Sequence, residues 1–135
     1  MATLVDERGF SMVTKITDSE LEVMRILWQE GRPLSFSEIR TALESRTDWK
    51  KSTIQTLLGR LRDKGAVGTR EHYVTLYSPR VSEAEYVKTE GQHFLDKLFD
   101  GSAMKLVTAL CQSGQIDERD VDELKAFFQM GDDAK

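Results

Sequence analysis

The sequence has few residues that could form covalent cross-links or cysteine-based metal sites. Cys111 is the only cysteine among 135 residues, which excludes an internal disulfide and a cysteine cluster within one chain. No apolar run approaches the roughly 20 residues that a membrane span needs, and the N-terminus lacks the apolar stretch of a secretory signal. These absences predict a cytoplasmic protein without a membrane segment.

Residue patterns typical of enzymes are missing as well. There is no Ser-His-Asp set, Cys-His pair or glycine-rich phosphate loop. His72 and His93 are the only histidines, and neither has a metal-ligand spacing to a carboxylate or thiol. We therefore expect no enzyme activity, no cofactor and no metal.

Charge is distributed unevenly along the chain. The formal net charge is -4, but residues 1–81 carry +2 and residues 82–135 carry -6. Residues 46–70 contain seven Lys and Arg residues but only two Asp residues. A local basic patch is typical of nucleic-acid binding, although a solvated basic helix face accounts for this charge run equally well.

Capping patterns and apolar periodicity predict two helices in the first third of the chain. Residues 17–20 and 35–38 read Thr-x-x-Glu and Ser-x-x-Glu, the capping boxes in which each side chain satisfies a free backbone N–H. The first helix should run from Thr17 to Gly31, where glycine followed by Pro33 stops it. The second should span about Ser35 to Ser45.

A third helix and a hairpin follow. The helix should begin near Lys50 or Lys51 and end at Gly65, a left-handed cap. In residues 66–79, apolar and polar side chains alternate well enough to predict two short antiparallel strands, with the reversal near Arg70 to His72. Three helices and a hairpin predict a winged helix-turn-helix domain at residues 16–81, after a flexible tail at 1–15.

The third helix carries two chemically different faces. In a helix-turn-helix protein this helix lies in the major groove, where Gln55 could pair with adenine. Thr53 and Thr56 could contact phosphate or a thymine methyl, and Gly59 would allow close approach. The predicted DNA-binding residues, including two from the wing, are Lys50, Lys51, Ser52, Thr53, Gln55, Thr56, Arg60, Arg70 and His72.

The sequence pattern of residues 82–135 predicts helices only. The predicted fold class of the whole chain is therefore mainly α. We expect helices at Ser82–Phe99, at Ser102–Gln112 and from about Asp117 onward. Three amphipathic helices in about fifty residues cannot readily enclose their own apolar surface, which predicts a helical dimerisation domain. Its predicted contact residues are Phe94, Leu95, Leu98, Leu106, Leu110, Leu124, Phe127 and Phe128.

Three segments carry a family resemblance. TIQTLLGRLRDKGAV, at residues 53–67, resembles the recognition-helix signature of the penicillinase repressor (BlaI/MecI/CopY) family. ITDSELEVMRILW and EAEYVKTEGQHFLDKLFDGS are similar to that family's opening helix and linker helix. The resemblance covers about Ile16 to Phe128. It implies a homodimeric transcriptional repressor that binds double-stranded operator DNA at a palindromic site.

Departures from the family pattern limit what else the resemblance implies. Ala109 and Leu110 stand at the Asn-Phe bond that a signalling protease cuts in the antibiotic-sensing branch, so we expect that cleavage to be lost. No cysteine follows Cys111, which excludes the copper branch's Cys-x-Cys metal site. Lys51-Ser52 replaces a frequent Pro-Lys, which predicts a different operator sequence.

Two alternatives remain open at this point. The chain could be a winged-helix regulator whose C-terminal helices bind a small effector, or a protein-interaction module that does not bind DNA, as its net acidity permits. A signalling protease also remains an alternative partner.

Overall fold

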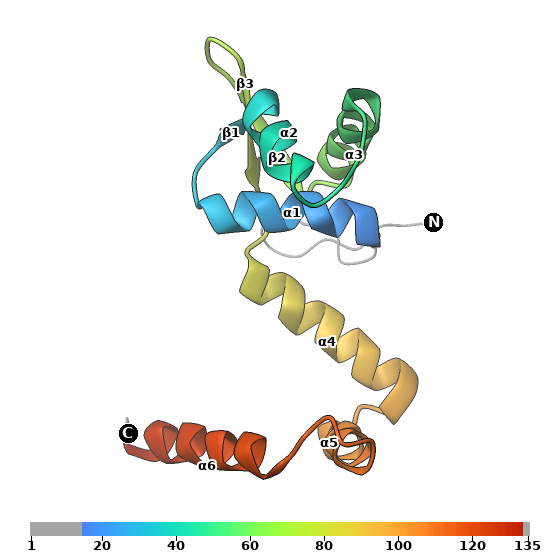
Figure 1. Ribbon diagram of the computed structural model, residues 1–135, viewed down its shortest axis with the longest axis vertical. Helices are drawn as coiled ribbons and strands as arrows, with labels where there is room; N and C mark the ends of the chain where they lie inside the picture. Colours follow the sequence, from blue (N-terminus) through green and yellow to red (C-terminus); the bar gives the residue numbers. More distant parts are fainter. Residues whose placement is uncertain (1–14, 134–135) are drawn as a thin grey trace. The chain divides into compact units, whose positions relative to one another are not determined.

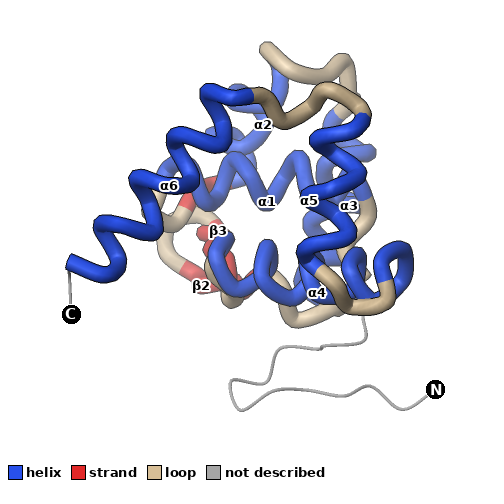
Figure 2. The backbone as a smooth tube through the Cα atoms, turned by 90° about the horizontal axis from the view of Figure 1, so that it is seen from below, coloured by secondary structure: helices blue, strands red, loops and turns tan. Residues whose placement is uncertain are grey.

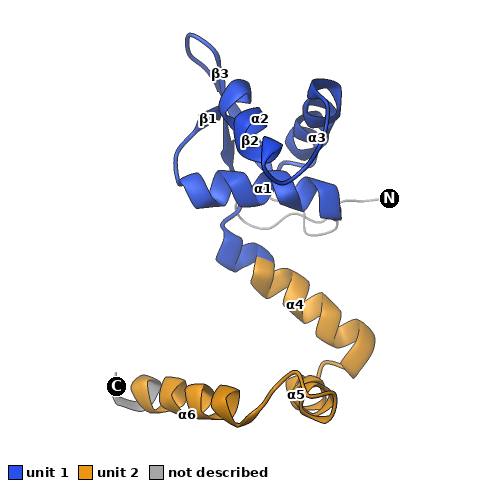
Figure 3. Ribbon diagram, viewed as in Figure 1, with its two compact units in different colours: residues 1–86 blue, residues 87–135 orange. Residues whose placement is uncertain are grey.

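The computed structural model describes residues 15–133 (Figure 1), so nearly all of the predicted tail lies outside the described residues. The chain divides into two compact units, residues 1–86 and 87–135 (Figure 3). We call them the winged-helix unit and the helical unit. Helices make up most of the described chain, and strands occur only in the winged-helix unit (Figure 2).

The first two helices begin and end where their capping residues predict. Helix α1 spans Asp18–Glu30 and α2 spans Phe36–Glu44, and both capping boxes are formed by their N-cap residues, Thr17 and Ser35. Gly31 ends α1 in the left-handed conformation, with φ of 65°. Both predicted helices are confirmed.

The third helix and the wing complete this fold. Helix α3 spans Lys51–Asp63, and Gly65 follows it with φ of 81°. Strands β2 (Val67–Glu71) and β3 (Thr75–Pro79) form the antiparallel wing. The predicted reversal at Arg70 to His72 is wrong, because Arg70 and Glu71 still pair with Leu76 and Thr75, and the turn comes at residues 72–74.

The sheet also contains a strand that the sequence did not predict. Strand β1 (Leu34–Ser35) pairs with β3, which gives the order β1-β3-β2. Leu34 lies opposite Tyr77 and is buried. The pairing therefore ties the start of α2 to the base of the wing.

Helices α1 to α3 and the sheet enclose one apolar core. Glu20, also buried, forms an ion pair with Lys64 that joins the first turn of α1 to the end of α3. The core therefore fixes α3 against α1. The buried apolar residues all lie between positions 16 and 81 and are Ile16, Val23, Met24, Ile26, Leu27, Leu34, Ile39, Leu43, Ile54, Leu57, Leu58, Leu61, Ala66, Val67 and Val81.

Trp28 holds the segment that leads from the wing into the next helix. Its indole N–H donates to the Val81 carbonyl at 2.9 Å, and its ring lies 5.7 Å from that of Tyr86. These contacts attach the first turn of α4 (Glu83–Phe99) to α1. They account for the division of the chain at residues 86 and 87, inside α4.

The helical unit consists of the rest of α4, α5 (Ala103–Gln112) and α6 (Glu118–Asp133). Positive φ angles at Asp100 and Gly101 separate α4 from α5. No residue from 87 to 130 is classed as buried. None of the helices in residues 15–133 is long and apolar enough to span a membrane.

Candidate nucleic-acid interface

Helix α3 presents a polar face because its apolar residues are all used in the core. Ile54, Leu57, Leu58 and Leu61 are at most 5% exposed. Every DNA-binding residue predicted on or before this helix is exposed, as are the two predicted in the wing. These exposed residues are Lys50, Lys51, Ser52, Thr53, Gln55, Thr56, Arg60, Arg70 and His72.

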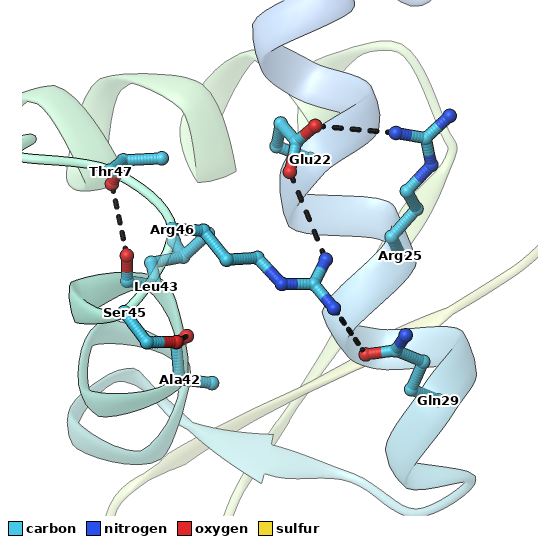
Figure 4. A network of polar contacts seen from close by, with 8 residues as sticks. All are labelled: Glu22, Arg25, Gln29, Ala42, Leu43, Ser45, Arg46 and Thr47. Atoms are coloured by element: carbon cyan, nitrogen blue, oxygen red, sulfur yellow. Dashed lines mark hydrogen bonds and ion pairs between the residues drawn. The ribbon is translucent and has the colours of Figure 1, made fainter.

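Part of the basic patch inferred from the sequence is neutralised within the fold. Figure 4 shows Arg46 reaching α1, where Nη1 lies 3.8 Å from Glu22 Oε2 and Nη2 donates to Gln29 Oε1 at 3.0 Å. Lys64 pairs with Glu20. These contacts connect helices and offset part of the charge of the basic patch.

The remaining cations lie on or next to the polar face. Arg62 is exposed and lies 3.8 Å from Asp63, its neighbour in sequence. Four others form no ion pair with any described residue, so their charge is free to meet phosphate. These four are Lys50, Lys51, Arg60 and Arg70.

Thr56 and Gly59 on α3 differ in the groups that they can present to a nucleic acid. The Thr56 hydroxyl donates to the Ser52 carbonyl at 2.9 Å, so its proton is already used and its methyl group is the better contact for a base. Gly59 has no atom within 4 Å of where a Cβ would lie. Glycine costs about 1 kcal/mol in a helix interior relative to alanine, and no contact in the described chain requires it.

A groove between α2, α3 and the wing adds residues that the sequence analysis missed. Its volume is about 440 Å³, and predicted residues Lys51 and Gln55 line it together with Ser37, Thr75 and Tyr77. Ser37 lies in the first turn of α2, beside the N-cap residue Ser35. The capping pattern placed this turn, but only the β1–β3 pairing brings it beside the wing.

The tip of the wing exposes an aromatic side chain. Tyr73 is 97% exposed and its ring lies 5.0 Å from that of His72 in an edge-to-face arrangement. The turn is closed by the His72 N–H, which donates to the Val74 carbonyl at 3.1 Å. Figure 1 shows the turn between β2 and β3 extending beyond α2.

The predicted dimerisation residues are all exposed or half-buried. Within α5, Leu106 and Leu110 are half-buried, as is Ala109, and the Ala109–Leu110 bond lies inside regular helix. Leu95 is also half-buried. The rest are 43–69% exposed and comprise Phe94, Leu98, Leu124, Phe127 and Phe128.

Three helices, a three-stranded sheet that includes the β2–β3 wing, and a basic polar face on α3 define a winged-helix protein with a candidate nucleic-acid interface. A second, helical unit follows it. The model of the penicillinase repressor family matches residues 16–130. The chain belongs to the penicillinase repressor family.

Characterised relatives match over most of their length. The penicillinase repressor of Bacillus licheniformis is 30% identical over 118 residues, which cover 87% of this chain and 91% of that protein. The methicillin resistance regulatory protein MecI of Staphylococcus aureus (strain N315) is 26% identical over 112 residues, covering 82% and 90%. The solution structure of monomeric Bacillus licheniformis BlaI with the blaP half-operator covers 55% of this chain and 90% of its own, with 36% identity and a TM-score of 0.48.

Proposed function

We propose that this chain is a transcriptional repressor that binds operator DNA through α3 and acts as a homodimer on a palindromic site. The observation that carries the proposal is the exposed face of α3, where cations that pair with no acidic side chain of residues 15–133 accompany short polar side chains. Membership of the penicillinase repressor family supports it, since two relatives are named as a penicillinase repressor and a resistance regulatory protein.

The chemistry of this face suits the major groove. Gln55 can form paired hydrogen bonds with adenine, and the Thr56 methyl can contact the methyl group of thymine. Lys51 and Arg60 can contact phosphates on either side, which sets register and adds salt-dependent affinity. Gly59 lets the DNA backbone approach α3 closely.

The wing and the start of α2 would contact the flanking backbone. Arg70 on β2 forms no ion pair with any described residue, and His72 and Tyr73 lie in the turn that follows β2. Lys51 and Thr75 line the groove between α2, α3 and the wing. A phosphate in this groove would meet the Lys51 ammonium, which can donate to it, whereas the Thr75 hydroxyl already donates to Glu71 Oε1 at 3.0 Å.

A homodimer accounts for the exposed apolar side chains of the helical unit. Phe127 and Phe128 are 69% and 67% exposed, and two aromatic rings beside each other on one helix favour a protein partner. A second copy would bury them and would hold two α3 helices about one turn of DNA apart, facing two half-sites.

The first experiment measures binding of the full chain to the promoter upstream of its own gene, titrated against bulk DNA at several salt concentrations. We expect tighter binding to one sequence than to bulk DNA. The Lys51→Ala, Thr56→Ala double variant should weaken operator binding by roughly tenfold or more, and its salt slope should fall by about one.

A matched control removes the same groups elsewhere on the winged-helix unit. The Arg25→Ala, Ser19→Ala variant loses one charge and one hydroxyl from α1, where both residues are exposed, and should bind like the unmodified chain. Equal binding by the α3 variant would overturn the assignment of α3. Binding no tighter than to bulk DNA would favour a protein-interaction module instead.

Release from DNA would not use cleavage at residues 109 and 110. The bond lies within α5, and proteolysis there would require that helix to open locally. Neither Ala109 nor Leu110 provides the family's Asn-Phe pair. We expect the chain to stay intact at this bond when its host is induced, as checked by mass spectrometry of the recovered protein. A cut there would restore the signalling protease as a partner.

A further inference from the structure

A second groove on the winged-helix unit lies where the end of α1 meets the chain that enters α4. Its volume is about 510 Å³, and it is lined by Leu27, Trp28, Gly31, Arg32, Pro33 and residues 78–83. No residue of α3 lines it. Grooves of about 300–1,000 Å³ are the size that small-molecule sites have.

The apolar part of this groove is held in place by internal contacts. Leu27 and Val81 belong to the core, and the half-buried Trp28 packs against that core. The hydrogen bond from Trp28 to the Val81 carbonyl and the ring contact with Tyr86 fix the indole. With Pro33 and Pro79 nearby in the lining, the groove offers a preformed surface to an apolar ligand.

The charges around the groove favour one anionic group. Arg32 donates to Glu38 Oε2 at 2.6 Å, so its charge is balanced. Arg80 has no ion pair with any described residue, and its side-chain stem lies over Gly68, where an added Cβ would be 3.3 Å from it. Glu83, exposed in the first turn of α4, also lines the groove and repels anions, so an anionic group is favoured only beside Arg80.

We propose that this groove binds a small amphipathic organic anion. Its apolar body lies against Trp28 and the two prolines, and its single carboxylate pairs with Arg80. Because the groove and α3 share no residue, this binding site is separate from the DNA interface. It also lies in the winged-helix unit, and not in the C-terminal helices, to which the sequence-based alternative assigned a small effector.

The test uses the full chain without DNA, so its result does not depend on operator binding. The chain has two tryptophans, and the Trp49→Phe variant leaves Trp28, within the groove, as the only one. Cyclohexanecarboxylate is the probe because it does not absorb where tryptophan does. Its uncharged analogue, cyclohexanecarboxamide, is the control ligand.

We expect cyclohexanecarboxylate to change the Trp28 emission in a saturable way and the carboxamide to have no such effect at the same concentrations. In the same background, Arg80→Gln should weaken binding of the carboxylate by about tenfold, whereas Arg80→Lys should retain most of it. Arg40→Gln removes an exposed charge from α2, outside the groove, and should leave binding unchanged.

Three outcomes would overturn the proposal. The first is an emission that does not respond to the carboxylate, the second is an equal response to the carboxamide, and the third is unchanged affinity in Arg80→Gln. If Arg80→Gln does not fold, as judged by its thermal melt, the comparison of the two ligands and the Arg80→Lys variant still decide the question.

Discussion

In the winged-helix unit, α1 places Leu27 in a closed core, whereas in the helical unit α6 leaves Phe127 69% exposed. Both helices are amphipathic, and both begin at side chains that cap their first turns. An apolar helix face is therefore a poor guide to what packs against it. The apolar face of α1 packs within the chain, whereas that of α6 stays exposed among the described residues, and the proposed dimer would bury it.

The two regions also differ in charge. Residues 82–135 carry a net charge of -6, which would repel the DNA backbone. Lys51 and Arg60 on α3, Lys50 beside it and Arg70 on β2 carry positive charge in the winged-helix unit and form no ion pair with any described residue. The division fits a molecule in which one unit meets the nucleic acid and the other meets protein.

The largest expected effect is the difference in unfolding free energy between replacing a buried leucine and replacing an exposed one. Leu58 is 2% exposed in the winged-helix core and Leu98 is 60% exposed on α4. Leu58→Ala should lower the free energy of unfolding by about 3 kcal/mol, because it leaves a cavity. Leu98→Ala, measured at concentrations low enough for monomer, should change it by under about 0.5 kcal/mol. Denaturant unfolding followed by circular dichroism checks both, and equal losses would mean that α4 has a core within its own chain.

The next largest effect concerns the proposed dimer contact at the apolar face of α6. Phe127→Ser should raise the dissociation constant of the proposed dimer about thirtyfold, an effect of about 2 kcal/mol typical of a central aromatic contact. Sedimentation velocity over a range of concentrations measures it. Gln129→Ser, on the same helix and also exposed, is the control and should leave dimerisation unchanged. A native chain that is monomeric at every concentration would contradict the dimer itself.

Two glycines offer a matched pair, one in each region. Gly59 in α3 and Gly91 in α4 both have open space where a Cβ would lie. Replacing either with alanine should raise stability by up to about 1 kcal/mol, because helix interiors favour alanine. Only Gly59→Ala should also weaken operator binding, because its methyl group would meet the DNA. Thermal melts and DNA titration measure the two effects, and unchanged affinity in Gly59→Ala would argue against close approach at this turn.

Sequence reasoning predicted the helices well because their signals are local. The capping boxes at Thr17 and Ser35 placed α1 and α2 to within a residue, since the partners lie three positions apart. The two chemically different faces of α3 were also predicted from the sequence. These features need no knowledge of what lies across the fold.

The features that sequence reasoning missed depend on contacts between distant segments. Strand β1 has two residues, too few to show an alternating pattern, and forms because β3 lies beside it. Arg46 was counted with the basic patch although it is bound to α1. The groove that joins Ser37 to Thr75 was missed for the same reason, because 38 positions separate these residues in the sequence.

The smallest expected effect is a loss of stability of the winged-helix unit at low pH. The hydrogen bond from Arg32, followed by that from the Ser35 backbone, lowers the pKa of Glu38 from 4.5 to about 2. Burial raises the pKa of Glu20, but bonds from Lys64 and Thr17 outweigh it and leave this pKa below its usual value. A carboxyl whose pKa is lowered by folding stabilises the fold above its unfolded pKa, and this stability is lost as pH falls through the folded pKa.

The winged-helix unit should therefore lose stability between about pH 4.5 and pH 2, as Glu20 and Glu38 take up protons and release Lys64 and Arg32. Tryptophan emission follows this unit alone, because Trp28 and Trp49 both lie in it. Glu38→Gln cannot ionise, so its thermal midpoint should be lower at neutral pH and should fall less steeply in acid. Glu44→Gln, exposed at the end of α2, should follow the unmodified chain. If Glu38→Gln shows the unmodified slope, the Arg32–Glu38 pair adds nothing to the acid response, and the winged-helix unit would depend on Glu20 and Lys64 for it.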